Sequence, residues 1–276
     1  MAPIALAKIV PHGYSRFIMI GFFIKKAFFD GWDNLLGLVG YNLGYLVVLL
    51  GAYGALEVLA VSSWLGIALL IVVSALNSAY SGTVSYLVKQ YAWYQKPAFA
   101  EIKMAFLDSW RHSVLHFLIN TMLLLVAFVV LPFYLSAQSM LMFAIAVVLF
   151  WVALACLMAM MYYFPLAAQM PRDNPRKTLK KSFMVLGDNM GFSIFLGLYS
   201  IVGTALTVVF ATIIPGVAGM SLGHQVAMKL LMFKYDYLEE HPDTKKRQVP
   251  WEELLFEERE RVGKRTLRGM IFPWKE

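Results

Sequence analysis

Few residues of this chain have types and spacing that could support chemistry, and they lie in or beside apolar stretches. Glu57 is the only acidic residue outside the segments that carry basic residues. In a transporter such a carboxylate could relay protons or hold a cation, whereas hydration in the headgroup layer is the simpler interpretation. His224 and Gln225, with Lys229 close behind, make one apolar segment unusually polar. Glu57, His224 and Gln225 are therefore the candidate residues of a polar path.

Two histidines, His112 and His116, have the i, i+4 spacing that places both side chains on one helical face. This spacing occurs in zinc sites, but no HExxH motif or other ligand set accompanies it. The sequence also contains no Walker A loop, no GxSxG motif and no paired intramembrane aspartates. We therefore predict no metal, no cofactor and no enzymatic activity.

A second group of residues within apolar stretches is typical of helix packing. Asn42 and Asn120 can form hydrogen bonds between helices, as polar groups inside membranes commonly do. Gly40 and Gly44 form a GxxxG pair, which lets another helix approach closely. These four residues are the predicted packing residues.

The elements that must position these side chains are membrane helices. The chain is 60% hydrophobic and only 15% charged, whereas soluble domains carry about 25% charged residues. The net charge of +7 is dispersed between apolar stretches, which favours an anionic lipid surface over nucleic acid as its partner. Five stretches have the roughly 20 apolar residues that cross a bilayer, and a sixth is shorter. The five are 35–56, 64–88, 114–135, 140–164 and 190–214, and the sixth is 217–233.

The distribution of basic residues predicts the topology. All 24 Lys and Arg residues lie before the first span, between spans two and three, between spans four and five, or from Lys229 onward. Because positive charge stays cytoplasmic, we expect six crossings with both termini in the cytoplasm. The expected domains are an N-terminal cytoplasmic and interfacial segment (1–34), a six-span bundle (35–234) and a charged cytoplasmic tail (235–276).

Similar sequences precede the first, third and fifth spans. They are anchored by Phe28, Phe106 and Phe183, at intervals of 78 and 77 residues. Asn42 and Asn120 follow the first two anchors at the same distance. We interpret the chain as an all-α, polytopic membrane helix bundle of three tandem repeats, each an interfacial amphipathic helix followed by a hairpin. The alternative is that any amphipathic helices leading into spans share aromatic residues.

The tail is highly charged but carries large apolar side chains. Residues 250–258 predict a short helix with Pro in its first turn, ended by Gly263. The tail is expected to dock on the chain's own bundle, on the membrane or on a partner protein. The candidate partner-docking residues are Trp251, Leu255, Ile271, Phe272 and Trp274.

The order of parts over residues 28–238 resembles the YesL-like family of small bacterial membrane proteins, which has no known activity. The resemblance rests on Tyr-Tyr-Phe-Pro-Leu at 162–166, the basic stretch 176–183, the fifth span with the glycine-bearing sixth segment, and the amphipathic stretch 99–110. Genes of that family often neighbour carbohydrate ABC importers. The resemblance therefore implies the bacterial cytoplasmic (inner) membrane and an accessory role in sugar uptake, and it supplies no catalytic residues.

Two functions follow as hypotheses. The first is a non-enzymatic accessory or scaffold subunit of a carbohydrate transport complex, which contacts the lipid bilayer and other membrane subunits such as an ABC importer. The alternative is a small-molecule transporter or channel in its own right, with the hairpins around a central path.

Overall fold

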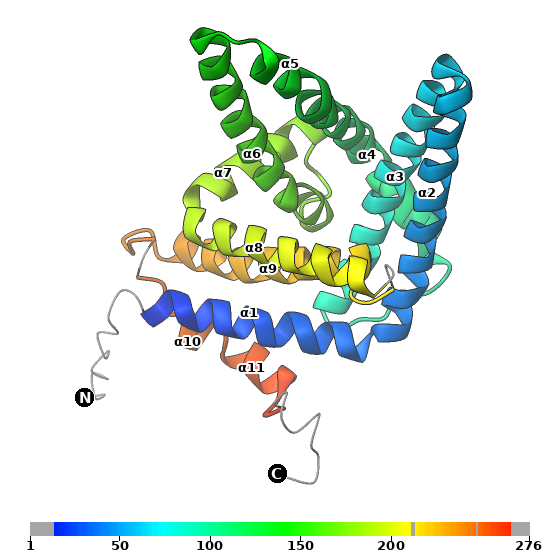
Figure 1. The fold of residues 1–276 in the computed structure, drawn as a ribbon. Helices are drawn as coiled ribbons and strands as arrows, with labels where there is room; N and C mark the ends of the chain where they lie inside the picture. The colour runs from blue at the N-terminus through cyan, green and yellow to red at the C-terminus, as the bar shows by residue number, and fades with distance from the viewer. Residues whose placement is uncertain (1–13, 211–212, 247, 266–276) are drawn as a thin grey trace, which may run out of the picture. The chain divides into compact units, whose positions relative to one another are not determined.

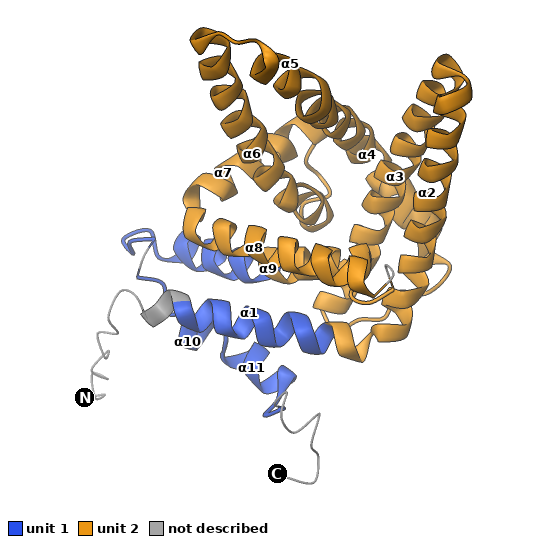
Figure 2. Cartoon of the chain, viewed as in Figure 1, with its two compact units in different colours: residues 1–30, 229–276 blue, residues 31–228 orange. Residues whose placement is uncertain are grey.

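The computed structural model describes residues 14–210, 213–246 and 248–265, and the regular secondary structure in these ranges is entirely helical (Figure 1). The chain divides into two compact units (Figure 2). Unit 1 comprises residues 1–30 and 229–276, and unit 2 comprises residues 31–228. Unit 1 combines the N-terminal segment with the tail and the last part of the sixth apolar segment.

Unit 2 contains the long apolar helices. Five helical segments are long and apolar enough to cross a membrane, which confirms an all-α, multi-pass membrane architecture. They are α2 (Leu35–Val61), α3 (Ser63–Ala92), the continuous segment Glu101–Ser136, α6 (Met140–Gln169) and α8 (Met190–Val209). The segment Glu101–Ser136 consists of α4 (Glu101–Leu125), a π-helical turn η1 (Val126–Val130) and α5 (Leu131–Ser136).

The sixth apolar segment forms α9 (Gly216–Glu240), which is not among the five candidate spans. The polar and charged side chains that interrupt it, including Gln225 and Lys229, lower its hydropathy. Six crossings and the orientation of the termini therefore stay predictions.

The first hairpin is held together where glycines of α2 meet tyrosines of α3. A Cβ atom at Gly37 or Gly44 would collide with the side chain of Tyr91 or Tyr80, respectively. Tyr80 also donates a hydrogen bond of 2.8 Å to the backbone oxygen of Tyr41. Because glycine has no side chain, α2 and α3 pack closely at these positions, and the tyrosine rings occupy the space.

A shorter amphipathic helix, α7 (Pro175–Asp188), precedes α8 and begins at Asn174-Pro175, a pair of residues typical of a helix start. Asn174 caps it, because its side chain accepts a 2.8 Å hydrogen bond from the backbone N–H of Lys177. Pro175 occupies the first turn, where no backbone donor is needed. Asp173 forms ion pairs with Lys177 at 2.7 Å and with Lys181 at 2.5 Å. These hydrogen-bonded lysines hold the pKa of Asp173 below its usual value.

Helix α8 and the first half of α9 pack antiparallel to each other. Ser200 contacts His224, while Gly203 lies against Met220 nearer the turn. In Figure 1, α8 runs crosswise to the α2–α3 hairpin, and the tips of the α2–α3 and α5–α6 hairpins point apart. Unit 2 is therefore splayed at one side rather than closed into a parallel bundle.

Unit 1 contains most of α1 (Tyr14–Asp33), the end of α9, and two short helices of the tail, α10 (Trp251–Leu254) and α11 (Phe256–Val262). The single helix expected at 250–258 is thus two helices that meet at Leu255. Gly263 ends α11 with a φ of 76°, a left-handed conformation that glycine adopts without strain.

Candidate functional site

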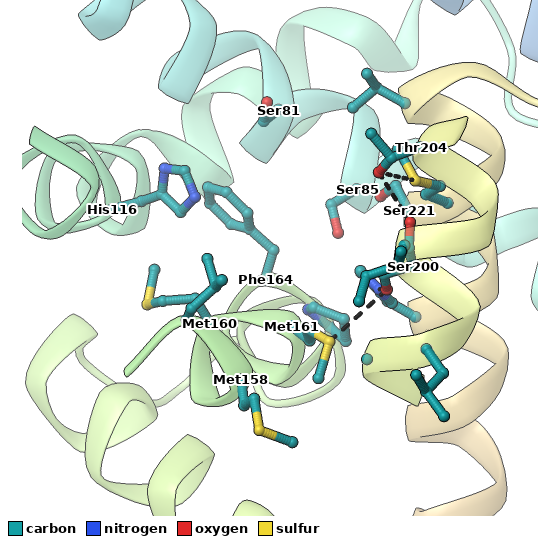
Figure 3. Close-up of a pocket in the computed structure, with 18 of the residues that line it drawn as sticks. Ser81, Ser85, His116, Met158, Met160, Met161, Phe164, Ser200, Thr204 and Ser221 are labelled. Atoms are coloured by element: carbon teal, nitrogen blue, oxygen red, sulfur yellow. Dashed lines mark hydrogen bonds between the residues drawn. The ribbon is translucent and has the colours of Figure 1, made fainter. Parts of the chain in front are cut away.

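A cavity of about 940 Å³ lies within unit 2, between α6 and the α8–α9 pair (Figure 3). Residues of α2, α3 and α4, among them Tyr45, Ser85 and His116, complete its wall. No Asp, Glu, Lys or Arg residue is among the residues that line it. The side chains are mostly aliphatic, and three methionines of α6 lie on one side, as Figure 3 shows: Met158, Met160 and Met161.

Most hydroxyl groups of the cavity wall form hydrogen bonds within the protein. Ser200 lies 2.8 Å from Nε2 of His224, and Thr204 donates a 2.8 Å hydrogen bond to the backbone oxygen of Ser200. Tyr45 donates to Ser81 Oγ at 3.2 Å. Because these groups are already paired, the wall offers little hydrogen-bonding capacity to a polar ligand.

Of the three residues proposed for a polar path, only His224 lines the cavity. Gln225 is fully buried behind it, where its side-chain amide donates to the backbone and hydroxyl oxygens of Ser85 at 3.0 and 2.9 Å. Glu57 is exposed near the end of α2 and does not line the cavity. The structure therefore does not join these three side chains into one path.

The two spaced histidines have separate partners. His112 contacts Thr178 of α7 at 3.2 Å, and His116 contacts Ser78 of α3 at 3.0 Å. Across the described part of the chain, no group of three or more His, Cys, Asp or Glu side chains is arranged to hold a metal ion.

Among the predicted packing residues, Asn42 makes the most contacts. Its amide donates to the backbone oxygens of Ile213 and Pro215 and accepts from the backbone N–H of Ala218, all at 2.9 Å. It therefore joins the first span to the turn between α8 and α9. Asn120 lies half-buried on α4.

The GxxxG pair does not act as a pair in the structure. Gly44 admits the ring of Tyr80, but a Cβ atom at Gly40 would meet no heavy atom within 4 Å. The packing role of Gly40 stays a prediction, and among the described residues the glycine that shares the packed face with Gly44 is Gly37. Those two glycines are two turns apart, so they face α3 together.

The tail docks in cis over the part that the structure describes. Trp251 and Leu255 are buried within the chain and cannot contact a partner without leaving it. Partner docking by these two side chains therefore stays a prediction, one that would require them to leave this conformation. Ile271, Phe272 and Trp274 lie outside the described residues.

A buried charge cluster within unit 1, formed by Lys26, Asp30, Lys229 and Glu258, ties α11 to α1 and α9. Glu258 pairs with Lys229 at 2.8 Å and with Lys26 at 3.3 Å, and Lys26 also pairs with Asp30 at 2.9 Å. Both lysines are fully buried. Burial raises the pKa of Asp30 to about 6, although the neighbouring Lys26 acts in the opposite direction.

Further contacts surround the charge cluster. Lys25 donates to the backbone oxygen of Gly263 at 2.8 Å, and the Arg265 guanidinium lies 4.6 Å from the centre of the Phe29 ring. The sequence contains two signals for the charge cluster. One is the i, i+4 spacing of Lys26 and Asp30, and the other is Lys229 within an apolar segment. Neither signal identifies Glu258 as the partner.

No protein-family model, curated protein or solved structure matches the chain.

Proposed function

We propose that the chain is a non-enzymatic accessory or scaffold subunit of a membrane transport complex, and, from its resemblance to the YesL-like family, of a carbohydrate importer in a bacterial cytoplasmic membrane. The observation that carries this proposal is the composition of the cavity between the apolar helices. A carrier of a polar solute needs hydrogen-bonding or charged groups along its path. Here the described residues that line the cavity include no Asp, Glu, Lys or Arg, and the hydroxyl groups of Tyr45, Ser200 and Thr204 are hydrogen-bonded within the protein.

The docked tail supports the same proposal by presenting a charged outer surface. On α10 and α11 the buried side is formed by Trp251, Leu255 and Glu258, whereas Glu253 and Glu257 are exposed. Exposed acidic groups next to a rigidly held helix suit the polar rim of a protein interface. Partner contacts through the described tail would therefore use this acidic face.

Copurification and uptake experiments test this function. The full-length protein, isolated from native membranes, should bring down other transport subunits in constant ratio, and the protein alone in liposomes should not take up labelled sugars. Substitution of Glu253 and Glu257 by Lys should weaken the complex without changing the thermal unfolding of the purified chain. Uptake by the protein alone would establish the transporter alternative instead.

We further propose six crossings with both termini in the cytoplasm. Because the start of α9 packs antiparallel to the end of α8, through Ser200 with His224 and Gly203 with Met220, a membrane that α8 crosses is also entered by α9. Single cysteines at Ser62, Ser136 and Thr244 in a Cys156→Ser background test this topology. Labelling from outside at the first two positions and from inside at Thr244 is expected. Outside labelling of Thr244 would leave α8 and α9 as in-plane helices or a five-span arrangement.

The threefold repeat also belongs to this proposal. Its three anchors, Phe28, Phe106 and Phe183, are exposed to similar extents, at 37, 46 and 41%. Phe28 and Phe183 lie on α1 and α7, which precede long apolar helices, as interfacial anchors do. Phe106 instead lies near the start of the continuous apolar segment Glu101–Ser136. Spin labels at the three positions should report the same depth in the bilayer. Three different depths would contradict the proposed repeat.

A further inference from the structure

We propose that the cavity of unit 2 binds a hydrocarbon chain, the acyl tail of a membrane lipid that enters sideways from the bilayer. This inference goes beyond the accessory role, because it assigns the protein a ligand of its own that comes from the membrane and not from a transport partner.

The position of the cavity selects ligands from the membrane. Most of its wall is built by residues of α2, α3, α4, α6 and α8, which belong to candidate membrane spans, and α9 contributes the rest. A ligand at this depth must be soluble in hydrocarbon, because charged and unpaired polar groups are expensive there.

The chemistry of the wall points in the same direction. No charged side chain is available to hold a headgroup or a polar solute inside the cavity. The methionines at 158, 160, 161 and 220 supply flexible, polarisable surface, which adapts to a ligand without fixed shape. The volume of about 940 Å³ lies at the upper end of the range for small-molecule sites.

The cavity is open toward the lipid-facing side of α8. Ile194, Leu198 and Ile201 line it and yet are 52, 58 and 66% exposed. The apolar wall is thus continuous with the apolar surface that faces the bilayer, so a lipid chain can pass from one to the other without crossing water.

A partner's membrane helix fits the same opening less well. Helices pack in membranes along stripes of small residues, which let the backbones approach closely. On α8, Gly197 and Ala205 are small, but the exposed Ile201 stands between them on the same face. A thin, flexible acyl chain can pass such a side chain, whereas a rigid helix cannot.

Photo-crosslinking in vesicles tests the proposal. The full chain is reconstituted in phosphatidylethanolamine and phosphatidylglycerol vesicles with a trace of phospholipid that carries a diazirine in one acyl chain. After irradiation, labelled peptides are mapped by mass spectrometry. We expect the label to concentrate on the cavity faces of α6 and α8, several-fold above other exposed apolar faces such as that of α2.

Two glycine variants provide a matched pair. A Cβ atom at Gly197, in the cavity wall, and one at Gly40, outside the cavity, would both meet no heavy atom within 4 Å. Gly197→Trp should fill part of the cavity and lower its labelling several-fold, while Gly40→Trp should leave that labelling unchanged. Equal elution volumes and helical circular dichroism would show that both variants fold.

Two labelled probes identify the source of the chain. A second series replaces the labelled phospholipid by a free fatty acid that carries the diazirine. Cavity labelling by the fatty acid but not by the phospholipid assigns the cavity to a free fatty acid rather than a phospholipid tail. Uniform labelling of all exposed helices, unaffected by Gly197→Trp, would mean ordinary surrounding lipid and would overturn the proposal. A peptide of another membrane protein, crosslinked to α8 in native membranes in place of lipid, would overturn it in favour of a partner helix.

Discussion

Replacement of Glu258 by Gln should loosen the tail from the rest of unit 1. The Glu258 carboxylate contacts two buried ammonium groups, Lys229 at 2.8 Å and Lys26 at 3.3 Å. Its replacement by a neutral amide leaves two buried positive charges with Asp30 as the one acid of the charge cluster. The substitution therefore removes the group that balances charge where α11 meets α1 and α9.

The magnitude follows from the burial of these groups. Breaking a buried ion pair by removing one partner costs about 3–5 kcal/mol. The buried side chains of Trp251, Leu255 and Val262 oppose release, each contributing about 1.5–3 kcal/mol. The tail of the variant should therefore remain docked most of the time but open more often, by about two to four powers of ten.

Hydrogen exchange of the backbone amides of residues 251–262, measured on the detergent-solubilised protein, reports this opening. Glu257→Gln is the matched control, because Glu257 is exposed one position away on the same helix. The double variant Lys229→Met/Glu258→Leu should recover most of the protection, since an apolar pair can replace a buried ion pair at little cost. Equal exchange in the Glu258→Gln and Glu257→Gln variants would refute the role of the charge cluster.

Three further predictions concern single side chains. The pKa of Asp30, raised to about 6 from 3.8 by burial, means that wild type gains stability as the pH falls through 6, because the folded state binds the proton first. Relative to Asp30→Asn, wild type should therefore gain up to about 3 kcal/mol of unfolding free energy when the pH falls from 7 to 4. Thermal unfolding of both proteins measures this difference, and a difference that does not change with pH would contradict the raised pKa. Gly44→Leu should cost about 1–3 kcal/mol by overpacking against α3, whereas Gly40→Leu should be neutral or slightly stabilising, and equal melting temperatures would contradict this contrast. Asn42→Ala removes three hydrogen bonds and should cost about 1–3 kcal/mol in the same assay, with an unchanged melting temperature as the contrary result.

Features that depend on local sequence could be predicted. Hydropathy identified the five candidate spans, Asn174 with Pro175 marked the start of α7, and Gly263 marked the end of α11. Each of these follows from residues that are close together in the sequence, where hydropathy and capping act directly.

Features that depend on residues far apart in the sequence could not be predicted. Glu258 and Lys26 lie more than 230 positions apart, and nothing near either residue names the other. The two glycine pairs show the same limit within one helix. A GxxxG pattern at Gly40 and Gly44 was visible, but the tyrosines of α3 decided that Gly37 and Gly44 form the packed face.

The hydrogen bonds of Asn42 have a consequence for how the protein is made. Asn42 leaves the ribosome long before its three backbone partners, Ile213, Pro215 and Ala218, which are translated more than 170 residues later. An amide in hydrocarbon without hydrogen-bond partners is costly, so the nascent first hairpin carries this cost until the last hairpin arrives. Chains that stop before residue 213 never acquire the partners. Such fragments keep a polar group exposed to lipid, and a membrane protease that surveys unassembled helices could distinguish them from the finished protein by this one side chain.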